Sequence, residues 1–323
     1  MTSKEHSIVA NALGSSCAGI ISRILTHPLD TAKARLQAPT SIQPPYKGVR
    51  NVLLRTYRSE GITSLYRGFG AVIIGGTPGT MAYFCSYEWI KTSIRKRDDA
   101  LPEFAIYFGA GMLAETIACI IYVPVDVIKE RLQVQNDASK NTFQQYKYNG
   151  SLDALKQIVK NEGISGLYKG YAATLASYGP FSAFYFLFYE QLKSRCKMFL
   201  NGKSNNTNNL YRSDEGKSDL PFPYVVLCSA TAGAAASWIT SPLDMAKLRL
   251  QIQRSSSNSI ISPTSSSPYQ HKGMIDCLSE IYKQGGFHGL FRGAGARVLH
   301  FTPATMITMT CFETCRSFFS SYI

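Results

Sequence analysis

The chain has 323 residues, 45% of them hydrophobic, and its 34 Lys and Arg against 21 Asp and Glu give a formal net charge of +13. This length is enough for a sizeable core, and the basic charge comes without a DNA- or RNA-binding motif, so we expect no nucleic-acid partner. The eight cysteines include no Cys-x-x-Cys pair, which disfavours a metal site and a disulfide framework. The sequence shows no pattern of a nucleophile with a base, so we do not expect an enzyme.

Long stretches with few or no charged residues recur along the chain. Three of about 20 residues or more contain no Asp, Glu, Lys or Arg: residues 68–87, 170–189 and 220–243. Three further apolar stretches cover residues 8–29, 104–125 and 298–312. Each of the charge-free stretches has roughly the 20 residues that a helix needs to cross hydrocarbon. The mean hydropathy is only −0.07, and Arg23 and Glu115 interrupt two of the other stretches. A charge at membrane depth is tolerated where it faces protein or water, so the pattern suits helices around a watery cavity.

Three motifs occur three times each, in a fixed order. The first reads Pro-x-Asp-x-x-Lys-x-Arg-Leu-Gln and begins at Pro28, Pro124 and Pro242. The second begins with Glu60-Gly61 and Glu162-Gly163, but its third copy, Gly285-Gly286, lacks the acid. The third motif places an aromatic residue before an acid, with a base three residues later, and its acids are Glu88, Glu190 and Glu313. This order predicts three repeats, at residues 1–98, 99–200 and 220–323, with a polar loop insertion at 201–219.

The three ordered motifs resemble those of the mitochondrial carrier family, and the resemblance covers the chain from about residue 9 to residue 316. It implies an all-α membrane protein with six transmembrane helices in three pseudo-threefold repeats around a central cavity, and with short amphipathic helices on the matrix side. It also implies a multi-pass protein of the mitochondrial inner membrane. Such a protein would move a small metabolite by alternating access.

The Asp and Lys of each first motif lie three residues apart and share a helical face. In an isolated helix they would pair locally, but in a ring of three repeats they can pair with neighbours. We expect the pairs Asp30–Lys129, Asp126–Lys247 and Asp244–Lys33. In the family such a ring closes the matrix side, and a glutamine at the end of the motif hydrogen-bonds an ion pair. Here those glutamines are Gln37, Gln133 and Gln251, for which the alternative is a solvated helix end.

The third motif implies a second gate on the cytoplasmic side. Its expected pairs are Glu88–Lys193, Glu190–Arg316 and Glu313–Lys91. Tyr87 and Tyr189 can support this ring through their hydroxyl groups, whereas Phe312 cannot.

Substrate contacts in the family lie midway along the even-numbered helices, three positions before a proline. Those pairs are here Gly75-Gly76, Ser177-Tyr178 and His300-Phe301. They include no arginine, which disfavours a polyanionic substrate. Arg23 and Glu115 would look into the cavity and suit a zwitterion or a cation-bearing metabolite, such as an amino acid or a cofactor-like molecule, unless they pair with each other or with polar neighbours. His300 is either a polar lining residue or a proton-coupling group.

The remaining expectations concern partners. Helix starts near Gly68, Gly150, Gly170, Gly273 and Gly293 should bind anionic lipid head groups, those of cardiolipin in particular, through backbone N–H groups. We expect a monomer that needs no cofactor. The alternatives are a carrier-like membrane adaptor without transport, a peroxisomal or plastid carrier, and a soluble helical solenoid, which the charge-free stretches disfavour.

Overall fold

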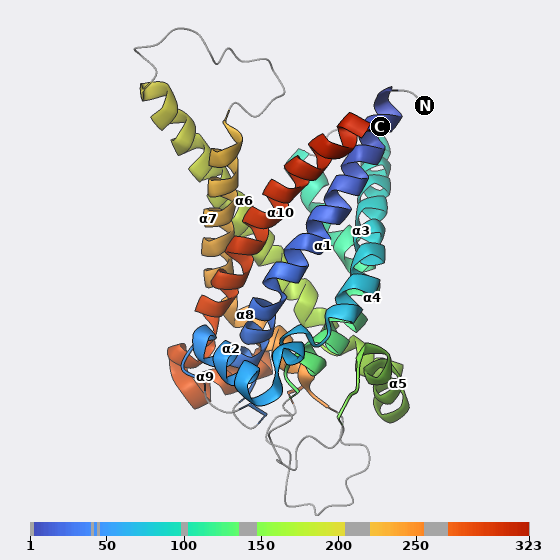
Figure 1. Cartoon of the computed structure of the whole chain (residues 1–323), viewed down its shortest axis with the longest axis vertical. Helices are drawn as coiled ribbons and strands as arrows, with labels where there is room; N and C mark the ends of the chain where they lie inside the picture. Colours follow the sequence, from blue (N-terminus) through green and yellow to red (C-terminus); the bar gives the residue numbers. More distant parts are fainter. Residues whose placement is uncertain are drawn as a thin grey trace, which may run out of the picture. The chain divides into compact units, whose positions relative to one another are not determined.

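The computed structural model describes residues 3–39, 42–43, 46–97, 103–135, 147–203, 220–254 and 271–322 (Figure 1). Over these residues all regular secondary structure is helical, in ten α-helices and two short 3₁₀ helices. The all-α prediction is therefore confirmed for the described part of the chain.

Six long helical stretches correspond to the six predicted spans. Five are single helices: α1 (Ser3–Gln37), α3 (Phe69–Arg97), α4 (Glu103–Gln133), α6 (Tyr171–Lys203) and α10 (Ala294–Tyr322). The remaining stretch consists of α7 (Phe222–Ile239) and α8 (Ser241–Ile252), which are separated at Thr240, two residues before Pro242. Proline removes a backbone hydrogen bond and crowds the preceding turn, so a break at this point is expected. The helices also continue through Pro28 and Pro124, so the same motif interrupts the helix in one repeat and not in the others.

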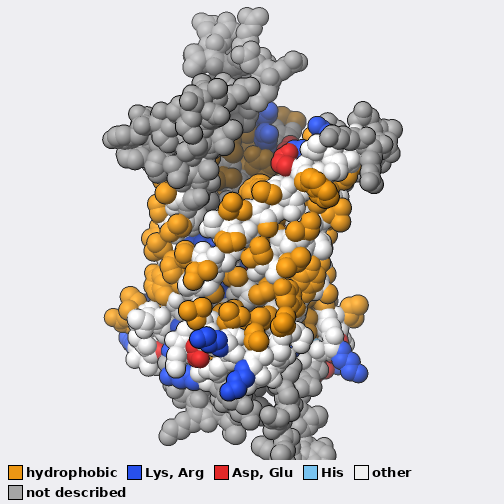
Figure 2. Space-filling model, turned by 90° about the vertical axis from the view of Figure 1, so that its right-hand side faces the viewer, with side chains coloured by type: hydrophobic (Ala, Val, Ile, Leu, Met, Phe, Trp, Pro, Cys, Tyr) orange, Lys and Arg blue, Asp and Glu red, His pale blue; other side chains and the backbone are white. Residues whose placement is uncertain are grey.

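Length and hydropathy alone identify two candidate membrane spans among the described residues, Ile106–Gln133 of α4 and Phe222–Ile239 of α7. Exposed large apolar side chains on α3 and α4 include Ile74, Met81 and Leu113. On the face drawn in Figure 2, hydrophobic side chains predominate along the flank of the long helices, and the charged side chains lie mainly toward its two ends. A continuous apolar flank of this kind suits contact with lipid.

Short helices follow each odd-numbered long stretch, as the sequence predicted. They are α2 (Val49–Glu60) with the 3₁₀ helix η1 (Ile62–Tyr66), α5 (Ser151–Glu162) with η2 (Ile164–Tyr168), and α9 (Met274–Leu290). Gly61 and Gly163 join the two parts with φ of 81° and 72°, a region that favours glycine. In the third repeat the corresponding turn is a kink inside α9 at Gly286, with φ of 56°.

The helices group into two compact units. The first unit comprises Met1–Thr26, Pro180–Thr240 and Arg297–Ile323, and the second comprises His27–Gly179 and Ser241–Ala296. In the second unit α3 and α4 pack side by side (Figure 1). Its largest apolar cluster joins α4 to α5 and η2 and includes Val123, Val127 and Ile158. The three Pro-x-Asp-x-x-Lys motifs lie in this second unit, which therefore holds most of the candidate site.

The predicted polar insertion starts later than expected. Helix α6 continues to Lys203, so residues 201–203 extend the helix. Residues 204–219 lie outside the described part of the chain.

Candidate functional site

Three ion pairs connect the repeats in the second unit. Each joins a lysine Nζ to an aspartate Oδ2 on another helix: Lys33 to Asp244 at 2.8 Å, Lys129 to Asp30 at 2.9 Å, and Lys247 to Asp126 at 2.7 Å. We call these six residues, carried by α1, α4 and α8, the lysine–aspartate ring. The partners are those expected from the sequence, and each pair joins two different repeats.

The ring is only partly shielded from solvent. Side-chain exposure ranges from 12% at Asp30 to 28% at Asp126. Each pair therefore falls between an exposed ion pair, worth about 0–1 kcal/mol, and a fully buried one, whose disruption costs about 3–5 kcal/mol.

The three motif glutamines are buried, with at most 1% of their surface exposed, so the solvated-helix-end interpretation is wrong. Gln133 Nε2 donates to Asp30 Oδ2 at 3.1 Å, and Gln37 Nε2 donates to Asp244 Oδ2 at 3.4 Å. Both contacts are of the kind expected for a brace on the ring.

Gln251 does not follow this pattern. Its Nε2 donates to Thr174 Oγ1 on α6 at 3.4 Å, rather than to an aspartate of the ring. Thr174 lies six residues before the proline of its helix, where the other two repeats have Val72 and Arg297. A hydroxyl acceptor is therefore available at this position in the second repeat alone, which explains the different contact.

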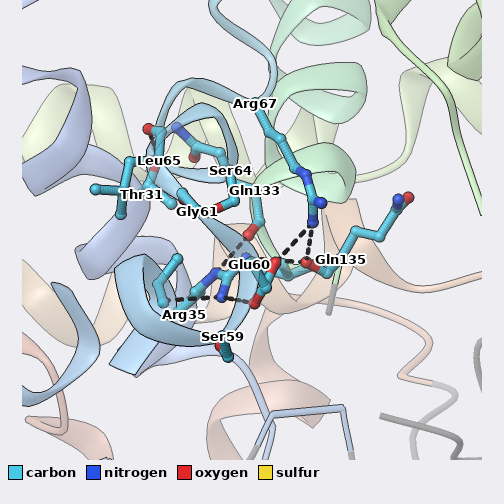
Figure 3. Close-up of polar contacts among 12 residues, drawn as sticks. Thr31, Arg35, Ser59, Glu60, Gly61, Ser64, Leu65, Arg67, Gln133 and Gln135 are labelled. Atoms are coloured by element: carbon cyan, nitrogen blue, oxygen red, sulfur yellow. Dashed lines mark hydrogen bonds and ion pairs between the residues drawn. The ribbon is translucent and has the colours of Figure 1, made fainter. Parts of the chain in front are cut away.

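A second layer of charge lies next to the ring and ties the first repeat to the second (Figure 3). Arg35 Nη1 lies 2.6 Å from Glu60 Oε1, and Arg67 Nη1 lies 2.8 Å from Glu60 Oε2. The same two arginines donate to backbone carbonyls at the end of α4: Arg35 to Gln133 and Arg67 to Gln135, both at 3.0 Å. Glu60 thus holds together α1, α2 and the end of α4.

The second repeat is joined to the third by an equivalent group of a glutamate and two cations, and we call such a group a glutamate clamp. Glu162 binds both Arg131 and Lys169, and Lys169 Nζ lies 2.7 Å from Glu162 Oε2. Arg131 and Lys169 also donate to the carbonyls of Gln251 and Gln253, each at 3.1 Å. Burial alone would raise the pKa of Glu162, but the hydrogen bonds and charges of the two cations outweigh burial and leave that pKa below its usual range.

The third repeat cannot form this clamp with a glutamate, because Gly285 stands in place of the acid. The sequence analysis gave the motif arginines Arg35 and Arg131 no role. Their recurrence in the first motif, combined with the acid of the second motif, was the available signal.

The cytoplasmic pairs behave differently. Lys91 Nζ lies 2.7 Å from Glu88 Oε1, three residues earlier on α3. The pairing of these two residues with Lys193 and Glu313 stays a prediction. Glu88 is exposed at the helix surface, where a neighbour one turn away is always within reach. The Lys193 ammonium lies over the ring of Tyr189 at 5.8 Å, and Glu190 is exposed. The side chains of Glu313 and Arg316 lie outside the described part.

Gly75 and Ser177, two of the predicted substrate contacts, have local packing and hydrogen-bond partners, and their role in substrate binding stays a prediction. A Cβ added at Gly75 would collide with Val125 of α4, so Gly75 allows α3 and α4 to approach closely. Ser177 donates its hydroxyl back to the Thr174 carbonyl on its own helix at 2.9 Å. Gly76 is buried and its carbonyl accepts from Thr80 at 2.8 Å. Tyr178, by contrast, reaches another repeat, with its hydroxyl 3.3 Å from that of Tyr83.

In the first unit an arginine that the sequence analysis missed lies one turn from His300 and Phe301. Arg297 Nη1 donates to the Ser237 carbonyl at 3.1 Å and to Thr240 Oγ1 at 2.9 Å. These groups lie at the end of α7, where the fifth stretch is interrupted. The guanidinium also lies 5.5 Å from the centre of the Phe181 ring, against which Phe301 packs edge-on at 5.3 Å. The i, i+3 spacing of Arg297 and His300 was the available signal.

The two other candidate charges are only partly accessible. Glu115 is 9% exposed, and its Oε1 lies 3.6 Å from the thiol of Cys119, one turn along α4. Arg23 is partly exposed on α1 and has interactions of its own.

Aromatic rings form a stack on each of two helices. On α3 the rings of Tyr83 and Tyr87 stack at 6.2 Å, and Lys91 lies 5.2 Å from the Tyr87 ring. On α6 the series Phe181, Tyr185 and Tyr189 has ring separations of 6.3 and 6.1 Å. Aromatic faces attract cations, and three of these rings already face a lysine or arginine.

Three repeats of long helices, connected by ion pairs between repeats close to the motif prolines, define a carrier-type membrane transporter. The family model described as "Mitochondrial carrier protein" matches residues 4–98, 101–199 and 218–322. The chain belongs to the mitochondrial carrier family. Members of this family are multi-pass transporters of the inner mitochondrial membrane and not enzymes, and this assignment applies to the chain.

Relatives cover nearly the whole chain but have different names. The chain is 35% identical to "Mitochondrial substrate carrier family protein E" of Dictyostelium discoideum, over 100% of both chains. It is 33% identical to the mitochondrial carnitine/acylcarnitine carrier protein of Rattus norvegicus, over 96% of this chain and 94% of that one. It is 31% identical to the succinate/fumarate mitochondrial transporter of Saccharomyces cerevisiae, over 95% and 90%. The family is thereby shown, and the substrate is left open.

Proposed function

We propose that this carrier moves a zwitterionic or cation-bearing metabolite by alternating access, and that the lysine–aspartate ring is its matrix gate. The observation that carries the gate is that all three ion pairs run between repeats, although each lysine has an aspartate three residues away on its own helix. Opening to the matrix requires that these three contacts separate. Because each pair is partly exposed, a small ligand can supply the differential binding energy that shifts the equilibrium.

The local Lys91–Glu88 pair supports the complementary half of the cycle. If the cytoplasmic gate closed, Lys91 would exchange Glu88 for an acid of another repeat. The energy of the local pair is small because Glu88 is 64% exposed. The two gates would then alternate, with the matrix ring formed in the conformation described above.

The substrate class is inferred from the side chains midway along the helices. Within the second unit, the ring of Tyr83 offers an aromatic face to a cationic group and Glu115 carries a carboxylate. Within the first unit, Arg23 and Arg297 carry guanidinium groups, which suit a carboxylate. The relative named for carnitine transport handles a zwitterion, which agrees with this combination, whereas the relative named for succinate and fumarate handles dianions.

A thermal-shift screen of the purified carrier tests the substrate class, because a ligand stabilises the state that it binds. The panel would contain carnitine, an acylcarnitine, lysine, succinate and ADP. We expect stabilisation by one of the first three, followed by uptake of that compound into proteoliposomes. Stabilisation and uptake of succinate or ADP alone would overturn the assignment of substrate class but leave the gate proposal intact.

The competing function is a membrane adaptor that does not transport. An adaptor has no need for a gate, so substitutions that weaken the ring would not change solute flux. Uptake of any panel compound that depends on the ring residues would exclude it.

We also propose that the carrier binds cardiolipin and acts as a monomer. The first turns of α2, α5 and α9 follow Gly48, Gly150 and Gly273, and none has a side-chain cap. Their backbone N–H groups therefore remain available for phosphate. Cardiolipin should restore the thermal stability of delipidated protein better than phosphatidylcholine, and equal rescue by both lipids would contradict this proposal. Mass measurement in detergent tests the monomer.

A further inference from the structure

Buried hydrogen-bond acceptors without a donor lie beside the lysine–aspartate ring. Three buried oxygens in and beside it have no hydrogen-bond partner among the described residues: Gln37 Oε1, Gln133 Oε1 and Glu130 Oε2. A buried acceptor without a donor costs about 1–3 kcal/mol, and more when the acceptor is charged. The carboxylate of Glu130 is therefore the most expensive of the three.

Glu130 is an acid that the other repeats do not have. It follows Lys129 in the second repeat, where the first and third repeats have Ala34 and Leu248. The residue is 7% exposed. Lys129 Nζ lies 3.1 Å from Glu130 Oε1 and also 2.9 Å from Asp30 Oδ2. One ammonium group thus serves two carboxylates, so this part of the ring carries an excess negative charge.

The other cations around Glu130 are already engaged. Lys33 of α1 binds Asp244, and Lys247 of α8 binds Asp126. The charged groups that act on Glu130 are those of Lys129, Asp30, Lys33 and Asp126. On the elements packed beside it, Arg35 and Arg131 bind the glutamates of the short helices, in the pairs Arg35–Glu60 and Arg131–Glu162. Arg249 of α8 has interactions of its own. No cation of these pairs supplies Oε2 with a donor.

We propose that Glu130 is a proton-binding site of the closed ring. A proton on Oε2 neutralises the excess charge and supplies a donor. Gln133, three residues further along α4, lies on the same helical face, and its Oε1 is the acceptor that needs one. Gln133 Nε2 already donates to Asp30 Oδ2. The proton therefore closes a cycle of contacts through Glu130, Lys129, Asp30 and Gln133.

The chemistry is a simple protonation. While the ring is closed, the Glu130 carboxylate accepts one proton from the water of the cavity, and the carboxylic acid returns it to water on the matrix side when the ring opens and Glu130 becomes hydrated. This step rests on the proposed gate. A proton bound on the side open to the cavity and released on the other side crosses with the solute, which makes the carrier a proton-coupled transporter.

Infrared spectroscopy of the purified carrier in lipid detects this proton without a known substrate. A protonated carboxyl group has a carbonyl stretch that is separate from the amide bands and moves in D₂O. We expect this band in the wild-type difference spectrum between acidic and alkaline buffer, its loss in Glu130→Gln, and its retention in Glu115→Gln. Glu115 is the matched control because it is a second buried carboxyl group on α4. The same band in Glu130→Gln as in the wild type would overturn the proposal.

Thermal unfolding against pH gives a second readout. The wild-type stability should fall as the pH rises through the range in which the band disappears, because alkali removes a proton that the closed form binds. In Glu130→Gln the amide replaces the carboxylic acid as a donor to Gln133, so this pH dependence should be lost while the protein still folds. If NaCl or KCl stabilises the wild type at high pH and no infrared band is seen, the proposal that Glu130 binds a proton is overturned, and a metal cation binds there instead.

The outcome is distinguishable from failure of the gate. If the infrared band is absent while Asp126 and Lys247 show energetic coupling, the proton proposal is wrong and the gate stands. If the band is present without that coupling, Glu130 binds a proton but the ring is no gate, and the coupling to transport is wrong.

Discussion

Lys247 of α8 and Asp126 of α4 are 121 positions apart in the sequence, yet their Nζ and Oδ2 atoms lie 2.7 Å apart. Exchanging the two charges should therefore be tolerated better than removing one. Asp126→Ala leaves Lys247 without this partner and should cost about 1–3 kcal/mol, because the pair is partly buried. The double variant Asp126→Lys with Lys247→Asp should recover part of that loss, measured by thermal unfolding in detergent. Coupling of Asp126 with Lys129 instead would mean that the motif forms local bridges.

The Glu162 clamp predicts a pH-dependent contribution to stability. The pKa of Glu162 is lowered in the folded protein, despite its burial, because Arg131 and Lys169 favour the charged form. Its contribution is therefore present above the ordinary glutamate range and is lost as the pH falls through the lowered pKa. Glu162→Gln should lower the unfolding temperature at neutral pH by several degrees, and this difference should shrink in strong acid. Asp153→Asn, at a partly exposed site on the same helix where the carboxylate accepts from Asn149 and Gln157 but forms no ion pair with an arginine or lysine of the described residues, serves as control and should have a much smaller effect.

The missing acid of the third repeat can be restored. Gly285 corresponds to Glu60 and Glu162, and a Cβ at this position meets nothing within 4 Å. Its φ is not among the positive values, so a side chain is tolerated. Gly285→Glu should bring a carboxylate toward Arg249 and Arg292 and raise stability by about 1–2 kcal/mol.

Two controls separate the charge from the backbone effect. Gly285→Ala should give only the smaller gain, about 0.4–1 kcal/mol, that follows from a less flexible unfolded chain. Gly286→Glu should destabilise, because φ at Gly286 is 56°. Equal stability of the Glu and Ala variants at Gly285 would show that no clamp forms.

Close packing of α3 on α4 gives a steric prediction. A Cβ at Gly79 would collide with the ring of Tyr122, which cannot move aside as a flexible side chain could. Gly79→Ala should therefore lower the free energy of unfolding by about 1–3 kcal/mol. Gly109→Ala on α4 has open space at the new methyl group and should be neutral or slightly stabilising. The comparison needs only unfolding temperatures, and a neutral Gly79→Ala would refute the close approach.

Much of the fold and the lysine–aspartate ring could be predicted because the signal occurs three times. A single Pro-x-Asp-x-x-Lys motif is ambiguous between a local and a distant partner, but three copies at corresponding positions favour pairing between repeats. The family resemblance predicted that the motif glutamines hydrogen-bond the ion pairs, and this prediction failed at Gln251, where Thr174 offers a hydroxyl that the equivalent Val72 and Arg297 do not.

Features that are not specified by the repeated motifs could not be predicted from those motifs. Glu130 occupies a position that the motif leaves unspecified, and its burial beside Lys129 became visible only in three dimensions. Gly75 resembled a ligand contact by position, whereas its neighbour Val125 shows that it serves packing. The local Lys91–Glu88 pair depends on the conformation of the carrier, which the sequence does not specify.

The close approach of α3 and α4 has a consequence for the exchange of segments between related carriers. Helix α3 ends the first repeat and α4 begins the second. The closely packed pair α3–α4 therefore spans the boundary between two sequence repeats and does not coincide with either one. A chimera joined at the repeat boundary combines α3 of one carrier with α4 of another, so the side chains that face each other between these helices come from different proteins. A chimera that transfers α3 and α4 together keeps Gly75 with Val125 and Gly79 with Tyr122, and it places the junctions in the short-helix segments.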